Sequence, residues 1–236
     1  MSLLSIAVVD VKEIFPGIYF IEYEDGRKVL ATKNLTPGHT VYDEKLVKWR
    51  GEEYRVWNPY RSKLAAAIIN GLKEVPIREG TKILYLGIAS GTTASHISDI
   101  IGPSGIIYGI EFAPRPLRDL IKVSELRKNI APLLKDARLP YEYSYIGETV
   151  DVLYADLAQP FQAEIFIRNA KMFLRPGGYG LIAIKARSID VTRPPEEVFE
   201  EQKNILESEG GFEVLEGVRL DPYARDHIMF RMRYII

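Results

Sequence analysis

One stretch, residues 82–112, constrains the fold of this 236-residue chain more than any other. It reads KILYLGIASGTTASHISDIIGPSGIIYGIEF. An apolar run is followed by a glycine turn, then by apolar residues at helical spacing, and then by a second apolar run that ends in Glu111. Continuous apolar runs joined through a helix are typical of parallel strands buried on both faces. The stretch therefore predicts a strand, a tight turn, a helix and a second, parallel strand.

The turn between the first strand and the helix has the composition of a ligand-binding loop. Glycines let the backbone approach a ligand closely, and the start of a helix offers unpaired N–H groups. Glu111 follows the second strand and can accept hydrogen bonds from the two hydroxyls of a ribose. We therefore expect Gly87, Ser90 and Gly91 of the turn to contact a ligand that contains a nucleoside.

The spacing within this turn favours one class of nucleoside cofactor. Residues 87–91 read G-x-x-x-G, whereas dinucleotide sites use G-x-G-x-x-G to admit a pyrophosphate, and no P-loop lysine follows Gly91. A cofactor with a ribose and a small zwitterionic tail fits this turn better than one that carries phosphates. S-adenosylmethionine matches that description, and a nicotinamide enzyme is disfavoured.

The rest of the chain extends the same sheet. Apolar runs predict strands at 130–134, 150–156 and 181–184, and two strands follow at 212–220 and 227–236. The pattern predicts an open, Rossmann-like α/β sheet, mostly parallel with an antiparallel last strand.

Ligands of such sheets bind beyond the carboxyl ends of the strands. The predicted strands bring five ionisable side chains to that edge: Glu111, Asp136, Asp156, Lys185 and His227. Because carboxylates, a lysine and a histidine converge on one edge, a functional role is favoured over a purely structural one.

Residues 1–55 have a different pattern, in which polar and apolar residues alternate. Runs at 18–23 and 28–32 flank an Asp–Gly pair, which indicates a β-hairpin, and residues 45–57 contain two more short strands. We predict a small antiparallel β subdomain over 1–55, used for packing or partner docking, and an α/β domain over 56–236.

Several helices are predicted within the α/β domain, at 64–72, 114–126, 163–174 and 196–209. Asn58–Pro59 is expected to open the first helix, and Lys63 near its start has the pattern of a solvated surface residue. Residues 175–178, which read RPGG, predict a turn that ends the third helix. The second helix carries a basic stripe of Arg115, Arg118 and Lys122. Such stripes are usually solvated, but this one starts beside the expected cofactor site, so contact with phosphates is the alternative.

Composition limits the classes of partner. The chain has 31 basic and 32 acidic residues, for a net charge of −1. A protein that held nucleic acid alone would usually be more basic, so help from other molecules is expected. Neither a membrane-spanning run nor the basic start of a signal peptide is found. The absence of cysteine excludes disulfides and cysteine metal sites and fits a cytosolic protein; no metal site is predicted.

Taken together, these motifs resemble one family, the archaeal fibrillarins. The matching stretches lie across nearly the whole chain: NPYRSKLAAAI (58–68), YLGIASGTTASHISDIIGPSG (85–105), YGIEFAPRPLRDL (108–120), DVLYADLAQP (151–160), IAIKARSID (182–190) and RDHIMF (225–230). The segment GIASGTTASH followed by IEF is highly specific for that family. The glycine- and arginine-rich extension of eukaryotic fibrillarins is absent, which argues against a nucleolar condensation role but not against catalysis.

The resemblance implies a class I S-adenosylmethionine-dependent methyltransferase that methylates ribose 2′-oxygens of rRNA and tRNA. It implies a catalytic tetrad of Lys63, Asp156, Lys185 and His227, which replaces the surface reading of Lys63. It implies cofactor contacts from Thr92, Thr93, Glu111, Phe112, Asp136, Ala137, Asp156, Leu157, Ala158 and Gln159. The implied partners are a box C/D guide RNA with its rRNA or tRNA target, a kink-turn-binding protein related to ribosomal proteins, and a Nop-type scaffold protein. The expected location is the archaeal cytoplasm, away from membranes.

Methyl transfer to a ribose hydroxyl needs help with proton loss, because the hydroxyl is a poor nucleophile while protonated. We expect Lys185, its charge balanced by Asp156, to hold the hydroxyl and to stabilise the alkoxide or accept the proton. Lys63 could lower the pKa of a lysine base, and His227 would orient the ribose or a phosphate. Two alternatives stay open: a protein glutamine methyltransferase that uses the same cofactor site, and a binding module without catalysis.

Overall fold

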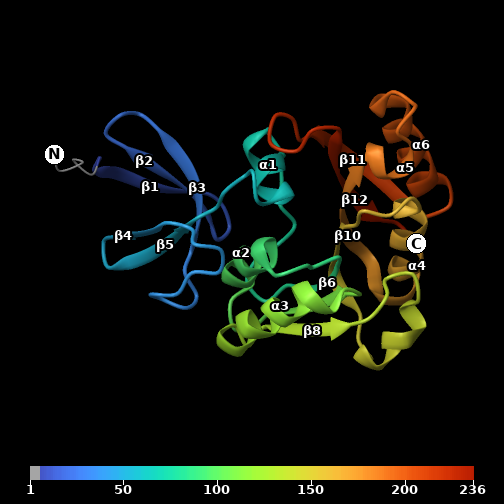
Figure 1. Ribbon diagram of the computed structural model, residues 1–236, viewed down its shortest axis with the longest axis horizontal. Coiled ribbons are helices and arrows are strands. Elements are labelled where there is room, and N and C mark those ends of the chain that lie inside the picture. The colour runs from blue at the N-terminus through green and yellow to red at the C-terminus, as the bar shows by residue number, and fades with distance from the viewer. Residues whose placement is uncertain (1–5) are drawn as a thin grey trace.

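The structure is a computed structural model that describes residues 6–236. Its larger sheet has seven strands in the order β11-β12-β10-β9-β6-β7-β8 (Figure 1). These strands are β6 Lys82–Leu86, β7 Ile106–Glu111, β8 Ile130–Leu134, β9 Val150–Asp156, β10 Leu174–Lys185, β11 Phe212–Arg219 and β12 His227–Tyr234. Strands β6 to β10 pair in parallel, whereas β12 is antiparallel to both β10 and β11. The predicted α/β sheet with an antiparallel last strand is confirmed.

Helices cover both faces of this sheet. They are α1 Lys63–Ile69, α2 Thr92–Ile101, α3 Pro114–Leu126, α4 Gln162–Phe173, α5 Ala186–Ile189 and α6 Pro195–Ser208, with a 3₁₀ segment η1 at Pro140–Ile146. Residues of α1, α2 and α3 form one buried apolar cluster with the sheet, and residues of α4, α6 and η1 form another. The two clusters make the chain a three-layer α/β/α structure.

The glycine turn between β6 and α2 has the backbone that its composition predicts. Gly87 and Gly91 have positive φ angles of 74° and 93°, a region that glycine occupies without steric cost. A Cβ at Gly87 would lie 2.3 Å from the carbonyl oxygen of Asp156. The turn is thus packed against the end of β9, and a larger residue at Gly87 would push the two apart.

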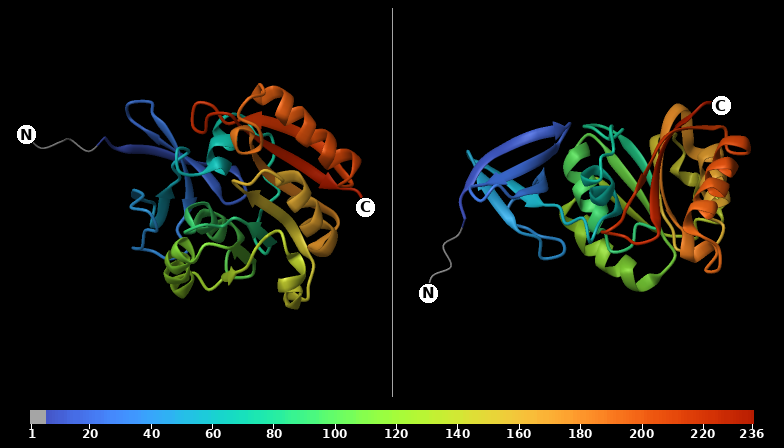
Figure 2. Two further views of the ribbon diagram at one scale, coloured as in Figure 1. Left: turned by 45° about the vertical axis from the view of Figure 1, so that its right-hand side comes forward. Right: turned by 90° about the horizontal axis from the view of Figure 1, so that it is seen from above.

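The N-terminal residues form a second sheet at one end of the molecule (Figure 2). Its strands are β1 Val8–Phe15, β2 Ile18–Tyr23, β3 Lys28–Lys33, β4 Leu46–Trp49 and β5 Glu52–Val56, in the order β1-β2-β3-β5-β4. All neighbours in this sheet are antiparallel, and the expected hairpin is β2–β3. Strand β1 was not predicted. Residues 1–5 of the predicted β subdomain lie outside the described residues, and its boundary at 55/56 stays a prediction.

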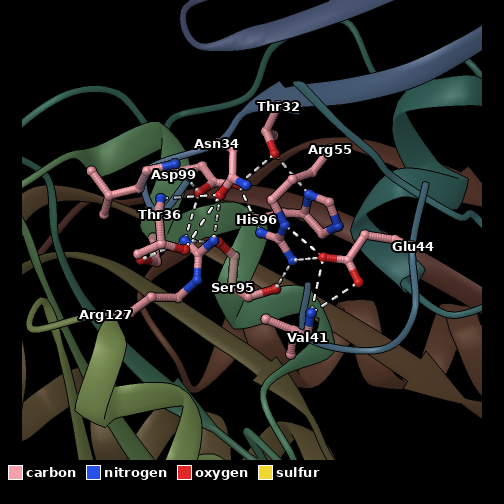
Figure 3. Close-up of polar contacts among 12 residues, drawn as sticks. Thr32, Asn34, Thr36, Val41, Glu44, Arg55, Ser95, His96, Asp99 and Arg127 are labelled. Carbon is pink, nitrogen blue, oxygen red and sulfur yellow. Dashed lines mark hydrogen bonds and ion pairs between the residues drawn. The ribbon is translucent and has the colours of Figure 1, made fainter. Parts of the chain in front are cut away.

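A buried polar network joins the second sheet to α2 and α3 (Figure 3). The Asp99 carboxylate accepts hydrogen bonds from Arg55 at 2.8 Å and from Arg127 at 2.6 Å. Arg55 also donates to Glu44 at 2.6 Å and to the Ser95 hydroxyl at 2.8 Å. The side chains of Arg55, Asp99 and Arg127 are at most 1% exposed. Buried charges persist only when they are paired and hydrogen-bonded, as here.

His96 of α2 belongs to the same network. Its Nδ1 lies 2.7 Å from the Thr32 hydroxyl, its Nε2 lies 2.7 Å from the Tyr42 hydroxyl, and its ring stacks on Trp57. Burial lowers the pKa of His96 well below its usual value, and the nearby charges of Arg55 and Arg127 lower it further. A neutral imidazole between two hydroxyls therefore helps fix the N-terminal sheet on α2.

Two local predictions were wrong. Asn58–Pro59 does not open the first helix; α1 begins at Lys63, and Ser62 caps it by accepting a hydrogen bond from the Ala65 N–H at 3.4 Å. Serine is a preferred cap because its hydroxyl satisfies an unpaired N–H of the first turn. The RPGG segment is not a separate turn, since β10 starts at Leu174 and carries an irregularity before Tyr179. Among the described residues, no helix is long and apolar enough to cross a bilayer.

Candidate active site

Four side chains meet at the carboxyl edge of the large sheet: Lys63, Asp156, Lys185 and His227. Asp156 ends β9, and the neighbouring residue of β10 is Ala183, two positions before Lys185. Lys185 pairs in register with His227, the first residue of β12. Lys63 opens α1 and places its Nζ 2.7 Å from an Asp156 carboxylate oxygen. The last residues of β9 and β10 and the first residues of β12 and α1 therefore bring together positions that are up to 164 apart in the sequence.

Lys63 is positioned by a contact between α1 and α2. The Ser62 hydroxyl, directly before Lys63, accepts a hydrogen bond from the Thr93 hydroxyl at 2.9 Å. Both of these residues are buried. The Lys63 side chain is only 27% exposed and the Asp156 side chain 25%, so their ion pair is partly desolvated. Lys63 is therefore not the solvated surface residue that the local sequence suggests.

The ion pair differs from the expected one. Asp156 was expected to balance Lys185, but its carboxylate binds Lys63. Within residues 6–236, no carboxylate lies within 4.0 Å of the Lys185 ammonium group. The Gln162 side chain instead holds the Lys185 backbone, accepting from its N–H at 3.0 Å and donating to its carbonyl at 3.2 Å. Gln162 is fully buried, and no motif in the sequence marks this role.

His227 has a defined tautomer. Its Nδ1 lies 2.7 Å from the carbonyl oxygen of Arg225, and a carbonyl can only accept, so Nδ1 carries the proton. Burial lowers the pKa of His227, and the positive charges of Lys63 and Lys185 lower it further, against the Arg225 hydrogen bond and Asp156, which raise it. The ring is thus neutral at pH 7, with a free electron pair on Nε2.

A cavity of about 250 Å³ adjoins this group. Its walls are Gly87, Ala89, Ile110, Glu111, Phe112, Lys135, Ala137, Asp156, Leu157, Ala158 and Gln159. Eight of these residues are predicted cofactor contacts, whereas Ala89, Ile110 and Lys135 were not predicted. Asp156 belongs both to the cavity and to the ion pair with Lys63, so a ligand in the cavity would lie beside the four converging side chains.

Two backbone N–H groups hold the Glu111 carboxylate at the wall of this cavity. One carboxylate oxygen accepts from the Ala89 N–H at 3.0 Å and the other from the Ala113 N–H at 2.8 Å. Each oxygen keeps further electron pairs for other donors. The fixed carboxylate, with the apolar side chains of Ile110, Phe112 and Leu157 nearby, fits the ribose and base of a nucleoside.

Five predicted cofactor residues do not line this cavity: Ser90, Gly91, Thr92, Thr93 and Asp136. Ser90 and Thr92 line a separate cleft of about 440 Å³, whose other walls include residues 39–43 and α3. The hydroxyl of Thr93 points instead to Ser62. The Asp136 carboxylate binds the Arg138 guanidinium at 2.5 Å, which lowers the pKa of Asp136.

The predicted basic stripe lies on the exposed side of α3. Arg115, Arg118 and Lys122 are all exposed, and Lys122 forms a solvent-exposed ion pair with Asp119 at 3.4 Å. Such pairs contribute little to stability. Arg115 and Arg118 are therefore accessible to an external anion, and Lys122 also lines the larger cleft.

Comparison with known proteins identifies the family. The Fibrillarin family model matches residues 9–235. This chain belongs to the fibrillarin family. A fibrillarin-like rRNA/tRNA 2′-O-methyltransferase from Pyrococcus furiosus is 57% identical to it over 222 residues, which are 94% of this chain and 97% of that relative.

Two solved fibrillarin structures are also similar. Fibrillarin from Aeropyrum pernix, crystallised with natively bound S-adenosyl-L-methionine, has 57% identity and a TM-score of 0.89 over 97% of this chain and all of that one. The fibrillarin of a fibrillarin/Nop5p complex has 43% identity and a TM-score of 0.80 over 95% of this chain and all of that one. The sheet and the edge described above are therefore those of the fibrillarin fold.

Proposed function

We propose that this fibrillarin transfers the methyl group of S-adenosylmethionine to the 2′-oxygen of ribose in rRNA and tRNA. One observation carries the proposal: Lys63, Asp156, Lys185 and His227 meet beside the cavity that Glu111 lines. The activity is the one named for relatives that share 57% of their residues with this chain. The S-adenosylmethionine-bound relative supports the choice of methyl donor.

The cavity has the donor and acceptor groups that this cofactor needs. We assign the ribose hydroxyls to Glu111 and the base to the apolar wall around Phe112 and Ala137. Asp136 and the segment from Asp156 to Gln159 would complete the walls. We assign the zwitterionic tail to the N-terminus of α2, where the backbone N–H groups of Thr92 and Thr93 lack helical acceptors and favour an anion.

Once bound, the sulfonium supplies an electrophilic methyl group. The chain must then orient a 2′-hydroxyl and remove its proton as the new O–CH₃ bond forms. Lys185 has no carboxylate partner within 4.0 Å among residues 6–236, so its ammonium group is available to stabilise developing alkoxide charge. Lys63 neutralises Asp156 and fixes its carboxylate beside the cavity.

We assign proton acceptance to His227. Its Nδ1 hydrogen is committed to the Arg225 carbonyl, which leaves Nε2 as an acceptor. Burial and, after it, the positive charges of Lys63 and Lys185 favour the neutral ring by lowering its pKa. General-base assistance of this kind typically contributes about 10²–10⁴-fold in rate.

The proposed partners follow from charge and family. With a net charge of −1 and one exposed basic stripe, the chain has little capacity to bind RNA alone. The structure of a fibrillarin/Nop5p complex supports a Nop-type scaffold as one partner. We further propose that a box C/D guide RNA selects the target, that a kink-turn-binding protein holds the guide, and that Arg115, Arg118 and Lys122 contact RNA phosphates.

The test is methyl transfer from tritiated S-adenosylmethionine to a guide-paired RNA in the assembled complex. A matched RNA carries a 2′-deoxy group at the target nucleotide. Label on the ribose substrate alone is the expected result. Equal label on both RNAs, or label on protein, would contradict the proposal and would favour methylation of a glutamine side chain.

A further inference from the structure

Tyr60 is an exposed aromatic residue with an unusual anchor. It lies in the turn between β5 and α1, and its residue is 67% exposed. Its ring packs edge-to-face with Tyr223, with 5.0 Å between the ring centres and 72° between the planes. Tyr223 precedes β12 and packs against the buried core. The Tyr223 ring is therefore held by the core, while most of the Tyr60 side chain faces solvent.

The turn that carries Tyr60 is ordered by its own hydrogen bonds. The Asn58 side chain accepts from the Tyr60 N–H at 2.9 Å, and the Asn58 carbonyl accepts from the Arg61 N–H at 3.1 Å. The Asn58 N–H donates to the Tyr42 hydroxyl at 3.3 Å. Because the ring is already positioned, a ligand that packs on it would lose little further conformational freedom.

The Tyr60–Tyr223 pair also lies close in sequence to two of the four converging side chains. Tyr60 is three residues before Lys63, and Tyr223 is four residues before His227. The two segments lie side by side next to α1 (Figure 1). The pair thus joins the two segments that carry Lys63 and His227.

Positive charge accompanies both tyrosines. Arg61 directly follows Tyr60, Arg225 lies two residues after Tyr223, and both arginines are exposed. Exposed aromatic rings among cations are the composition by which proteins hold unpaired nucleotides, the ring by stacking and the cations by attracting the backbone. Exposed tyrosines elsewhere, such as Tyr145 of η1 at 64%, belong to elements that carry none of the four converging side chains and need no special explanation.

We propose that the free face of Tyr60 stacks on a base of the substrate strand, at or directly beside the target nucleotide, with Tyr223 as its support. This inference rests on the proposed RNA 2′-O-methylation. It also implies that the base leaves the stack of the guide–target duplex, since a paired and stacked base has no free face. Stacking would hold the strand while Lys185 and His227 act on the ribose.

Substitutions that keep size but remove the ring test this role. Tyr60→Leu should raise the Michaelis constant for guide-paired RNA by about 5- to 160-fold, the range expected for loss of one base–aromatic stack. Tyr60→Phe keeps the ring and should behave like the unmodified protein. Tyr145→Leu, at an equally exposed tyrosine in η1, is the matched control. Affinity for S-adenosylmethionine and the unfolding midpoint should be unchanged in all three.

A fluorescent base gives a direct readout. With 2-aminopurine at the target or at either neighbouring nucleotide, the Tyr60→Leu complex should fluoresce more brightly than the unmodified complex at one position, because the tyrosine ring quenches a base that has left the duplex stack. Equal fluorescence of the two complexes at all three positions, or equal Michaelis constants for Tyr60→Leu and the unmodified protein, would overturn the stacking role. If the unmodified complex does not methylate the ribose substrate at all, the proposed function fails, which is a separate result.

Discussion

At the scale of single residues, the least expected feature is the state of His227. A hydrogen bond from Nδ1 to a backbone carbonyl fixes the tautomer, and burial, together with two nearby lysines, lowers the pKa of the ring. Histidine is the side chain whose ordinary pKa lies closest to physiological pH, so small changes in its surroundings decide its charge. Here those changes favour a neutral ring that can accept a proton.

This state predicts a particular pH dependence. Because the folded-state pKa of His227 is lowered from 6.5, the single-turnover methylation rate should rise with pH through a value below 6.5 and stay constant above it. His227→Ala should lower the plateau about 10²–10⁴-fold and remove the acidic limb. A His227→Ala variant that retained the acidic limb would show that another group accepts the proton.

Sequence and structure diverge most at this scale. The residues that bear charge on strand ends could be placed from the sequence, because a parallel sheet brings its strand ends to one edge. The pairing of Asp156 with Lys63 could not, since it depends on where the start of α1 packs. The positioning roles of Gln162 and Ser62 could not be predicted either, because no motif distinguishes such a role from that of an ordinary buried amide or helix cap.

At the scale of elements, the N-terminal sheet is more than an appendage. Arg55 of β5, with Glu44 of the loop before β4, joins a charge network whose other members are Asp99 of α2 and Arg127 at the end of α3. Helix α2 starts at the glycine turn of the proposed cofactor site. The N-terminal sheet therefore stabilises the position of α2, whose first residues we assign to cofactor binding.

Removing the central carboxylate of this network should lower the stability of the protein. Asp99→Asn keeps the size of the side chain but leaves the buried Arg127 guanidinium without a carboxylate partner and Arg55 with Glu44 alone. The free energy of unfolding should therefore fall by about 3–5 kcal/mol. Urea titration of the purified protein measures this change. Asp119→Asn removes the exposed partner of Lys122 and should change the free energy by at most about 1 kcal/mol. Similar losses for both variants would contradict the role of the network.

Long elements were easier to predict than connections. Helix 114–126 and strands 130–134 and 150–156 match the structure because their apolar spacing is regular. Strand β1 was missed, although its residues have an alternating pattern, because its pairing with β2 depends on the tertiary sheet. The polar network was also missed, since Arg55 and Asp99 are 44 positions apart and each looks like an ordinary surface charge.

At the scale of the whole molecule, charge limits how RNA can be bound. A net charge of −1 gives little general attraction to phosphates. We therefore expect the isolated chain to bind guide-paired RNA far more weakly than the assembled complex does, and to methylate it only when the partners are present. Filter binding and methyl transfer, each with and without the Nop-type and kink-turn proteins, measure this dependence. Full activity of the isolated chain would contradict it.

The central claim is that binding of S-adenosylmethionine depends on Glu111 and methyl transfer depends on Lys185, two residues at the same edge of the sheet. Its most direct test combines calorimetric titration of S-adenosylmethionine with single-turnover methylation by the assembled complex. Lys185→Met should abolish most of the rate and leave the cofactor affinity within about two-fold. Glu111→Ala should weaken cofactor binding by about 10- to 100-fold, the range for hydrogen bonds to a charged group. Near-normal turnover by Lys185→Met with intact cofactor binding would contradict the account.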